Sequence, residues 1–578
     1  MTNNAEEIRA KAQTWIDSEV VDAETKSTIR KWIDNDPKEL TEAFYSDLEF
    51  GTGGLRGIMG VGTMRMNRYT VGMATQGLAN YLKAQGWSEI HVAIAHDSRN
   101  NSPFFTQTAA QVLSANGIHV HVFSDLRPTP LLSYAVRHLN AHAGIVVTAS
   151  HNPKEYNGYK VYWNDGAQVL PPNDKGIIAE VRRITSPDQV NFNGVSERIH
   201  TIGPEIEAAY EVDVKSLITA GDAIRQAKDV SIVYTALHGA GITMVPPMLK
   251  ALGFENVALV EAQSIPDGNF STVQSPNPEE REALSMALEL ADKLDADMVL
   301  GTDPDTDRVG LAIRDNRGQL MLLNGNQAAC ILVYFQLCQW QKSQRLNGAQ
   351  YIAKTIVTTD LLTRMAADFK VDCYETLTGF KYIAEVIRRF EGQSVFIAGG
   401  EESYGYSAGE FVRDKDAVLS SVLFCEIAAW CKANKSSMFD LLMEIYGKYG
   451  LFHEYLLSLT MKGLDGLQQI QQMMTDLRAT PPKELGGSPV VEIRDVQNDT
   501  VTDLITGQTT KMNLPSSNVL QFILEDGSKI SARPSGTEPK IKFYFSLRTT
   551  FAPTDDYHSK AAEMQVRIDA ICKALNLK

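Results

Sequence analysis

Two short segments of this sequence carry residues whose types and spacing can do chemistry. The first, Thr148 to Pro153, reads Thr-Ala-Ser-His-Asn-Pro and follows the apolar run Ala143 to Val147. That run predicts a buried strand, and ligands of open α/β sheets bind at the carboxyl ends of strands. We therefore interpret Ser150 as a nucleophile on a loop, with Gly158 permitting a tight return of the chain. A plain polar turn after a strand is the alternative.

The second segment, Asp303 to Arg308, reads Asp-Pro-Asp-Thr-Asp-Arg and follows the strand pattern of residues 296–301. Its three carboxylates would repel one another unless a cation lay among them. Oxygen ligands suit Mg²⁺ or a similar hard cation. An EF-hand is excluded, because its sixth and twelfth positions would hold Arg308 and Arg314. We expect a metal site here, with an acidic solvated turn as the alternative.

A glycine-rich segment precedes both. Gly51 to Gly60 contains five glycines around Arg56, which leaves the backbone able to present N–H groups to an anion. It is not a dinucleotide fingerprint, because Arg56 takes the place of the third glycine and no clear strand precedes it. We expect an anion-binding loop, with a flexible glycine turn as the alternative.

Two later loops are rich in hydrogen-bonding groups. Gly399 to Gly405 pairs two glutamates with a serine after a strand pattern at 394–398, which suits binding to sugar hydroxyls or, equally, capping of a helix. Arg533 to Lys540 combines an arginine, two hydroxyls and a glycine between two expected strands. That combination suits a phosphate, although a hairpin turn would explain the glycine alone.

Alternating strands and helices place most of these loops, and alternation of this kind implies parallel sheets covered by helices. Residues 6–48 are expected to be helical, and the part after 481 to be a separate α+β region. The expected strands are 91–95, 118–123, 143–148, 230–235, 257–261, 296–301, 309–313, 350–356, 371–376, 394–398, 489–495, 518–525, 528–532 and 540–547. The expected helices include 70–86, 102–116, 243–252, 280–294, 326–342, 380–391, 415–433 and 464–479.

Composition narrows the class of protein. A chain of 578 residues, 44% hydrophobic and 22% charged, suits a globular protein of about four domains at ~150 residues each. The net charge of −15 argues against general nucleic-acid binding but not against a small anionic substrate. No run of apolar residues is long enough to span a membrane, and Met1 to Arg30 has no signal-peptide core. Six cysteines without a paired motif favour a reducing cytoplasm.

Taken together and in this order, the five loops resemble those of the α-D-phosphohexomutase superfamily. The resemblance spans about Phe50 to Arg548 and is closest to phosphoglucomutases of the larger, phosphopentomutase-like branch. It implies an α/β fold of three related domains with mixed or parallel sheets, plus a C-terminal α+β domain, around a central cleft. The expected boundaries are 1–205 with the serine loop, 206–323 with the metal loop, 324–450 with the sugar loop and 451–578 with the phosphate loop.

The resemblance also implies roles for individual residues. Ser150 would be a phosphoserine that helps Asp303, Asp305 and Asp307 to hold Mg²⁺, and Arg56 and Lys160 would flank the transferred phosphoryl group. Lys160, with a lowered pKa, or His151 would act as the base, or His151 would only orient the loop. The implied substrate-binding residues are Arg308 beside the metal loop, Gly379, Lys381, Glu401 and Ser403 near the sugar, and Arg533, Ser535, Gly536 and Thr537 on the unreacting phosphate.

The implied activity is the interconversion of glucose 1-phosphate and glucose 6-phosphate, with Mg²⁺ as cofactor and glucose 1,6-bisphosphate as intermediate and activator. Pro304 stands where many members have glycine, which keeps phosphopentomutase open beside phosphomannomutase. A non-catalytic sugar-phosphate sensor is the alternative from a different class. We expect a cytoplasmic monomer or small homo-oligomer with a phosphosugar ligand and with neither nucleic acid nor membrane as partner.

Overall fold

The computed structural model describes residues 2–51, 53–461, 463–535 and 540–577. The chain forms two compact units, each assembled from separate stretches. Unit 1 contains residues 1–322, 384–392 and 405–434, and unit 2 contains residues 323–383, 393–404 and 435–578. Three α/β domains and a C-terminal domain make up the fold, as the sequence predicts.

The N-terminal helices α1 (Thr2–Asp17), α2 (Ala23–Asn35) and α3 (Pro37–Phe44) form a small helical layer in unit 1. Their apolar faces meet around Trp15, Ile29 and Phe44, which are almost completely buried. A cavity of about 680 Å³ lies between this layer and the neighbouring domain, lined partly by Trp15 and Thr70. None of the residues expected to do chemistry lines it.

The first sheet holds the serine loop. Its strand order is β1-β5-β4-β2-β3-β6. Strands β2, β3, β4 and β6 run parallel, whereas β5 is antiparallel to both β4 and β1. Because β2 and β4 are parallel, the loops after them leave from the same edge. The strands are β1 (Gly54–Ile58), β2 (His91–His96), β3 (His119–Phe123), β4 (Ala143–Val147), β5 (Tyr156–Trp163) and β6 (Ile199–Ile202).

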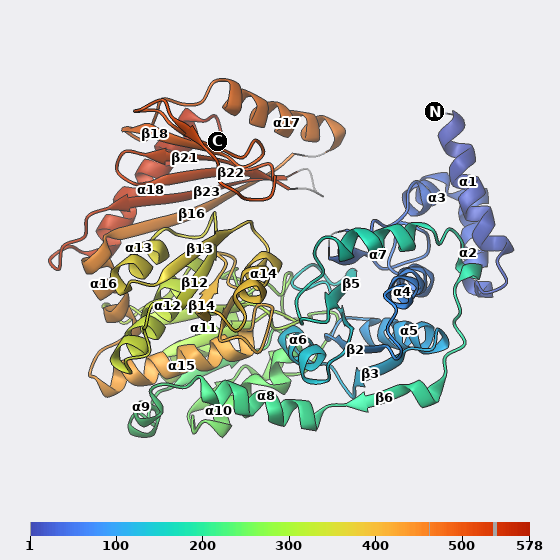
Figure 1. The fold of residues 1–578 in the computed structure, drawn as a ribbon, viewed down its shortest axis with the longest axis horizontal. Coiled ribbons are helices and arrows are strands. Elements are labelled where there is room, and N and C mark those ends of the chain that lie inside the picture. Colours follow the sequence, from blue (N-terminus) through green and yellow to red (C-terminus); the bar gives the residue numbers. More distant parts are fainter. Residues whose placement is uncertain (1, 52, 462, 536–539, 578) are drawn as a thin grey trace. The chain divides into compact units, whose positions relative to one another are not determined.

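Helices cover this sheet on both faces (Figure 1). Leu78 of α4 and Leu113 of α5 pack with Val92, Ile94 and other apolar side chains at alternate positions along the strands, which all lie on one face of the sheet. The helices are α4 (Arg68–Lys83), α5 (Ser102–Ala115), α6 (Thr129–His138) and α7 (Asn173–Arg182), with short 3-10 turns at Pro187–Gln189 and Ser196–Arg198.

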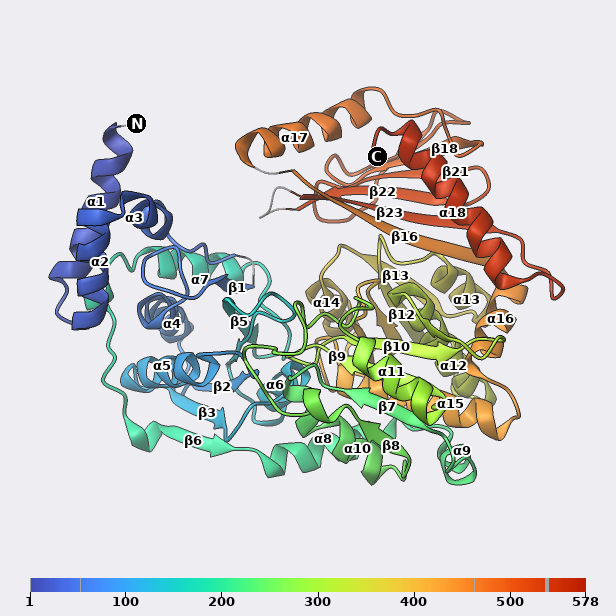
Figure 2. The same cartoon turned by 180° about the vertical axis from the view of Figure 1, so that it is seen from behind.

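The second sheet holds the aspartate loop and has the order β11-β10-β9-β7-β8. β7 is parallel to β8 and β9, but β10 returns antiparallel to β9. The helix α11 (Ser285–Leu294) covers one face (Figure 2). The strands are β7 (Ile232–Thr235), β8 (Val257–Leu259), β9 (Met298–Thr302), β10 (Val309–Arg314) and β11 (Leu320–Leu322).

The remaining elements of unit 1 pack around these two sheets. They are α8 (Pro204–Ser216), α9 (Gly221–Gln226), α10 (Val245–Ala251), α11 (Ser285–Leu294), α15 (Ala417–Ala433) and 3-10 turns at Ala240–Thr243 and Glu261–Gln263. The strand β15 (Tyr406–Ala408) is instead the edge strand of the third sheet, which has the order β13-β12-β14-β15. The helix α15 is buried along almost its whole length.

Unit 2 begins with the third α/β domain. Its central strand β12 (Gln350–Thr355) runs parallel to β13 (Asp372–Thr376) and to β14 (Val395–Gly400). The helices are α12 (Gly325–Lys342), α13 (Leu361–Phe369) and α16 (Met438–Tyr449), and α14 (Phe380–Phe390) begins in unit 2 and ends in unit 1.

The C-terminal domain is an antiparallel sheet in the order β16-β23-β22-β21-β18-β19-β20, with β17 paired to β18. Apolar residues of α17 and α18, such as Met474 and Ile571, share one core with the sheet (Figure 1). The elements are β16 (Leu451–Thr460), α17 (Gly463–Ala479), β17 (Glu484–Leu485), β18 (Ser488–Asp495), β19 (Thr500–Asp503), β20 (Thr509–Thr510), β21 (Leu520–Leu524), β22 (Lys529–Pro534), β23 (Lys540–Thr549) and α18 (Tyr557–Ala574).

Two local expectations are wrong. Gly54–Ile58, expected to be part of a loop, is the strand β1, and Gly158 lies inside β5 rather than at a turn. A Cβ added at Gly158 would lie 2.4 Å from the carbonyl oxygen of Thr148, so the glycine is needed for close approach of two backbones. The strands β5 and β10 run antiparallel to their neighbours, so both sheets are mixed, in agreement with the expected mixed or parallel sheets.

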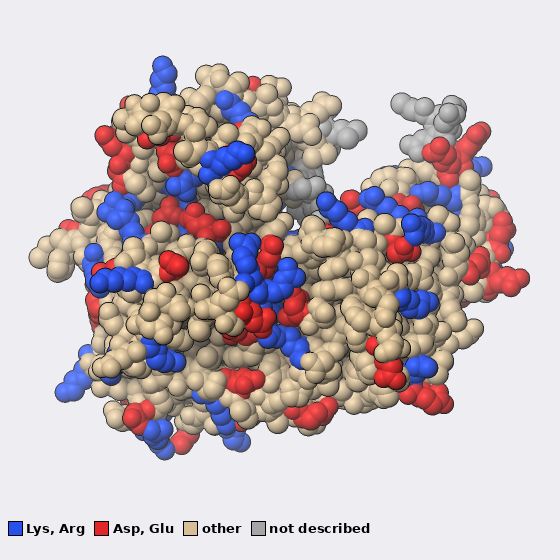
Figure 3. Space-filling view, in the orientation of Figure 1, with Lys and Arg blue, Asp and Glu red and all other residues tan. Residues whose placement is uncertain are grey.

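Three observations bear on the class of protein. Among the described residues no single helix is long and apolar enough to cross a membrane. The bent pair of helices α15 and α16 together has the length and composition of a span. Acidic and basic side chains are interspersed on the face shown in Figure 3, which has no extended basic area. No disulfide joins the six cysteines, and four of them are buried.

Candidate active site

Ser150 lies on a tight loop directly after β4. Its backbone has a φ of 53°, in the left-handed region that non-glycine residues rarely adopt. The loop is braced by Thr148, whose hydroxyl donates to Asp97 (2.6 Å) and accepts from the backbone N–H of Ser150 (2.8 Å). The Ser150 side chain is therefore fixed at the carboxyl edge of the sheet, as the sequence predicts.

The aspartate loop connects β9 to β10 in the second sheet. Asp303, Asp305 and Asp307 are all buried. One oxygen of Asp303 accepts the backbone N–H groups of Asp307 (3.1 Å) and Arg308 (3.0 Å). The loop thus holds its own first carboxylate in place, and it turns all three carboxylates toward one volume.

The two loops meet within unit 1. The Ser150 hydroxyl donates to the second oxygen of Asp303 (2.8 Å), and the Nδ1 atom of His151 lies 3.2 Å from the same hydroxyl. Ser150 and Asp303 are separated by 153 residues. The fold therefore brings the expected nucleophile to the expected metal ligands.

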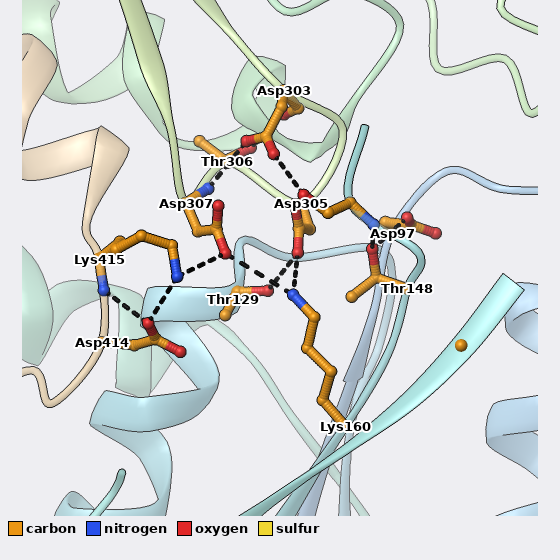
Figure 4. Close-up of polar contacts among 12 residues, drawn as sticks. Asp97, Thr129, Thr148, Lys160, Asp303, Asp305, Thr306, Asp307, Asp414 and Lys415 are labelled. Atoms are coloured by element: carbon orange, nitrogen blue, oxygen red, sulfur yellow. Dashed lines mark hydrogen bonds and ion pairs between the residues drawn. The ribbon is translucent and has the colours of Figure 1, made fainter. Parts of the chain in front are cut away.

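Two lysines neutralise the carboxylates from opposite sides (Figure 4). Lys160, on β5, bonds Asp305 (2.7 Å) and lies 3.6 Å from Asp307. Lys415 bonds Asp307 (3.2 Å) and Asp414 (3.0 Å). Burial opposes the charge of Lys160, but the two aspartates outweigh it and raise its pKa above the ordinary value. The lowered pKa expected for Lys160 as a base is therefore contradicted.

The same burial acts differently on the neighbouring groups. Burial and the negative charges of Asp305 and Asp307 raise the pKa of Asp303 well above the ordinary value. The pKa of Asp305 is lowered, because Lys160 outweighs burial. Burial, assisted by Arg308 and Arg56, lowers the pKa of His151 well below its ordinary value, so this imidazole is neutral near pH 7.

The aspartates fit a hard divalent cation. One oxygen from each lies within 4.8 Å of the others, and Oδ1 of Asp305 and Oδ1 of Asp307 are buried without a hydrogen-bond donor among the described residues. Buried carboxylate oxygens without donors are costly unless a cation binds them. An all-oxygen set of this kind suits Mg²⁺.

A cavity of about 250 Å³ opens beside these groups. Its wall includes Ser150, His151, Lys160, Arg308 and the exposed Arg56. Arg56 lies on β1 and approaches the Asn152 side chain at 3.5 Å, and Arg308 forms an ion pair with Glu279 (2.6 Å). The cavity thus joins the serine to several positive charges, which suits a phosphate group.

The remaining expected residues lie in unit 2. Glu401 follows β14, is buried, and accepts the backbone N–H of Gly379 (2.8 Å), which links two of the expected sugar-binding segments. Ser403 is partly buried two residues later, and the Nζ atom of Lys381 lies 5.4 Å from the centre of the Tyr382 ring. Within unit 2, Gly379 and Glu401 therefore come together.

The expected phosphate clamp is the connection between β22 and β23. Arg533 lies on β22 opposite Lys542, and the backbone N–H of Ser535 donates to the carbonyl oxygen of Lys540 (2.7 Å). Gly536 and Thr537 lie outside the described residues.

Comparison with known proteins identifies the family to which the chain belongs. Family models of phosphoglucomutase/phosphomannomutase α/β/α domains I, II and III match residues 47–188, 208–318 and 324–449. The chain belongs to this family. A phosphoglucomutase of Staphylococcus aureus (strain MRSA252) is 39% identical over 510 residues, which are 88% of this chain and 91% of that protein. A Staphylococcus epidermidis phosphoglucomutase is 38% identical over 538 residues, 92% of this chain and 96% of its own length.

Solved structures show the same fold. A putative phosphomannomutase of Thermus thermophilus has a TM-score of 0.68 at 21% identity, over 92% of this chain and 99% of its own. The Paramecium protein parafusin, a phosphoglucomutase, has a TM-score of 0.68 at 19% identity. The match covers 92% of this chain and 96% of the parafusin chain. This member of the phosphoglucomutase/phosphomannomutase family is accordingly an enzyme with phosphohexomutase activity, an isomerase of carbohydrate metabolism.

Two residues beside the site of this phosphohexomutase were not predicted from the sequence. Lys415 is separated by 108 positions from Asp307 and carries no motif of its own. Arg99 is a buried arginine under the serine loop. The run Arg413-Asp-Lys-Asp416 before an apolar helix pattern is the one signal that pointed to Lys415.

Proposed function

We propose that the enzyme interconverts glucose 1-phosphate and glucose 6-phosphate through a phosphorylated Ser150. The observation that carries the proposal is the hydrogen bond from the Ser150 hydroxyl to Asp303 (2.8 Å), inside a pocket that also contains Lys160 and Arg56. A nucleophile, a metal-ligand set and phosphate-binding cations thus share one volume. The glucose preference rests on the similarity to the Staphylococcus phosphoglucomutases.

In the proposed reaction, the phosphoryl group of phospho-Ser150 is transferred to the free hydroxyl of the bound sugar phosphate. The bond between phosphorus and Ser150 Oγ breaks, and a bond to the sugar oxygen forms, which gives glucose 1,6-bisphosphate. The bisphosphate turns over and returns its other phosphoryl group to Ser150. The same bisphosphate added in trace amounts activates enzyme that has lost its serine phosphate.

Each charged residue has a part in this transfer. Mg²⁺, held by Asp303, Asp305, Asp307 and a phosphate oxygen on Ser150, would neutralise charge on the transferred group. Lys160 stays protonated because its pKa is raised, so it acts as a fixed positive charge with Arg56. The proton released by the sugar hydroxyl must end on Ser150 Oγ, and the neutral His151, with Nδ1 at 3.2 Å, is placed to deliver it.

The residues of unit 2 would recognise the rest of the substrate. We propose that Glu401, Ser403, Gly379 and Lys381 contact the sugar, with Arg308 of unit 1 as a further contact. The unreacting phosphate would be bound by Arg533, Ser535, Gly536 and Thr537. We also propose domain boundaries at 205/206, 323/324 and 450/451, which the ranges matched by the family models support. A cytoplasmic monomer or small homo-oligomer completes the proposal.

A coupled assay tests the substrate. Purified enzyme is given glucose 1-phosphate, mannose 1-phosphate or ribose 1-phosphate at equal concentration, with Mg²⁺ and a trace of glucose 1,6-bisphosphate. The highest kcat/KM is expected for the glucose ester. A higher value for ribose 1-phosphate would keep the mechanism and reassign the enzyme as a phosphopentomutase.

Ser150→Ala tests the mechanism separately from the substrate. Because the variant lacks the only proposed acceptor oxygen, kcat is expected to fall by several orders of magnitude, and intact-mass measurement should find no phosphoenzyme. Ser124→Ala, at an exposed serine of the same domain, should behave like the parent enzyme. Undiminished turnover by Ser150→Ala would remove the assignment of the nucleophile.

A further inference from the structure

Four histidines gather on one face of the first sheet, away from the serine loop. His91 on β2 lies opposite His119 on β3, and His121 lies opposite His200 on β6. Paired residues and residues two apart share a face of a sheet, so all four side chains project from the same side. The other face carries Val92 and Val120 and belongs to the apolar core.

The four imidazoles form one continuous array. The ring centroids are 5.0 Å apart for His91 and His119, 5.3 Å for His91 and His121, 5.4 Å for His119 and His200, and 5.3 Å for His121 and His200. A fifth histidine, His142, accepts the backbone N–H of His91 through Nδ1 (3.1 Å). Five of the eleven histidines of the chain therefore lie in one patch.

Two pairs of ring nitrogens lie at hydrogen-bond distance, with the donor set by the tautomer of each ring. Nδ1 of His91 lies 3.0 Å from Nε2 of His121, and Nδ1 of His119 lies 3.1 Å from Nε2 of His200. Two imidazole nitrogens bound to one metal at ~2.05 Å are separated by about 2.9 Å at a right angle and about 3.3 Å at a tetrahedral angle. Both observed separations fall within this range, toward the right angle that Cu²⁺ and Ni²⁺ prefer.

The two pairs differ in their surroundings. A guanidinium N–H of Arg198 lies 3.0 Å from Nε2 of His119, which occupies that nitrogen and brings a positive charge beside the second pair. His91 and His121 have no such neighbour among the contacts of the described residues. Burial, together with the neighbouring imidazoles, lowers the pKa of His91 and lowers that of His121 to about 4. Both rings are therefore neutral near pH 7, as metal ligands must be.

We propose that His91 and His121 chelate a borderline divalent transition-metal ion, Cu²⁺ most tightly and then Ni²⁺ or Zn²⁺, on the face of the first sheet. Cu²⁺ binds most tightly because nitrogen ligands follow the Irving–Williams order. Mg²⁺, which prefers oxygen ligands, does not compete for this site. The site is distinct from the aspartates: His91 begins β2, and the strand ends about 16 Å farther on, beside the loop that carries Asp97.

An ion bound by His91 and His121 would link β2 to β3 near the amino ends of these parallel strands. It would therefore stabilise the first domain against unfolding, because it binds only when the two strands are paired. The catalytic residues lie at the opposite edge of the sheet, so turnover with Mg²⁺ does not require the ion.

Metal titration of the untagged full chain, saturated with Mg²⁺, tests the proposal. Isothermal titration with Cu²⁺, Ni²⁺ and Zn²⁺ is expected to give micromolar binding of Cu²⁺ at one site per chain, and electron paramagnetic resonance should show nitrogen ligands. His91→Asn and His121→Asn should each weaken Cu²⁺ binding at least tenfold. His138→Asn, at an exposed histidine of α6 outside the array, should not.

The outcomes separate the histidines from the aspartate loop. Loss of Cu²⁺ binding in Asp305→Asn but not in the histidine variants would overturn the proposal, and so would absence of binding at 100 µM. Because each strand contributes one ligand, the two variants are independent tests, and far-ultraviolet circular dichroism reports that each is folded. The proposed mutase reaction can fail without affecting this result, since binding is measured without substrate.

Discussion

The guanidinium of Arg99 donates a hydrogen bond to the backbone carbonyl oxygen of Ser150. It also donates to the carbonyl oxygens of Asn152, Pro153 and Tyr156. Arg99 is almost completely buried, and its charge is balanced by Asp97 (3.3 Å). One side chain therefore holds most of the serine loop in its left-handed turn, although it does not reach the hydroxyl itself.

Replacing Arg99 should weaken both the fold and the chemistry. Arg99→Met leaves Asp97 as a buried charge without its partner, so we expect a loss of about 3–5 kcal/mol in the free energy of unfolding. Arg99→Lys keeps the charge but not the fork of donors. As a positioning residue Arg99 should affect kcat rather than KM, and Arg99→Lys should restore part of the kcat lost in Arg99→Met.

Arg314 provides a matched control for these variants. Its guanidinium also donates to backbone carbonyl oxygens, those of Ala296, Ala291 and Gly318. Arg314→Lys should therefore lower stability without lowering the kcat of folded enzyme. An equal fall of kcat in both lysine variants at a temperature where both are folded would contradict a specific role for Arg99.

The aspartate loop predicts a defined response to metal. Asp305→Asn removes one negative charge from the three-carboxylate set and weakens the ion pair to Lys160. We expect Mg²⁺ to bind at least ~100-fold more weakly, measured by calorimetric titration and by the Mg²⁺ dependence of turnover. The exposed Asp292→Asn variant of α11 should leave both titrations unchanged. Parental Mg²⁺ affinity in Asp305→Asn would place the metal elsewhere.

Lys415 should matter for substrate binding. It is buried between Asp307 and Asp414 and lines the cavity beside Ser150. Lys415→Met removes positive charge from the proposed phosphate-binding pocket, so KM for the sugar phosphate is expected to rise at least tenfold. Lys432→Met, which removes an ion pair with Asp297 (2.9 Å) at the far end of α15, is the control. Equal KM values for the two variants would exclude Lys415 from the pocket's function.

Glu454 predicts a pH dependence of stability in unit 2. Burial raises its pKa to about 8, opposed by Thr359 and Ser546 and assisted by the charge of Asp360. Cys330, Tyr446 and Tyr557 also face this carboxyl group. Between about pH 4.5 and pH 8 the folded state therefore holds a proton that the unfolded state has lost. The contribution to stability is complete below about pH 4.5 and is lost as the pH rises through about 8.

Glu454→Gln should remove this dependence. At pH 9 the variant is expected to be more stable than the parent by about 2–4 kcal/mol, and at pH 5 the two should be nearly equal. Urea unfolding at pH 5, 7 and 9 measures the difference, with the exposed Glu289→Gln as control. If the urea midpoint of the parent does not decrease from pH 5 to pH 9 relative to that of Glu454→Gln, the carboxyl group of Glu454 is not neutral in the folded state.

The placement of the candidate site in unit 1 could be predicted from the sequence because each of its segments has a local signal. Ser150 and the three aspartates each follow an apolar strand pattern, and the parallel strands fix the edge from which their loops leave. The left-handed turn at Ser150 does not follow from that placement alone, because Thr148 and Arg99 hold the loop in it. Their meeting across 153 residues depends on two different sheets and was implied only by the family resemblance.

What the sequence did not predict depends on contacts between distant segments. β1 and β5 contain Gly54 and Gly158, which weaken any strand pattern, and both are strands because they pair with each other. Lys415 reaches the aspartates only because its segment belongs to unit 1. Arg99 acts through backbone carbonyls, for which no side-chain motif exists.

The interleaved course of the chain also constrains the order in which the enzyme can mature during synthesis. Unit 1 includes residues 405–434, with Lys415 and the buried helix α15, so its core and its charge balance are incomplete until residue 434 has left the ribosome. Unit 2 in turn needs residues near the carboxyl terminus. The serine loop and the aspartate loop are thus translated early, but the pocket that they share is finished only after most of the protein exists.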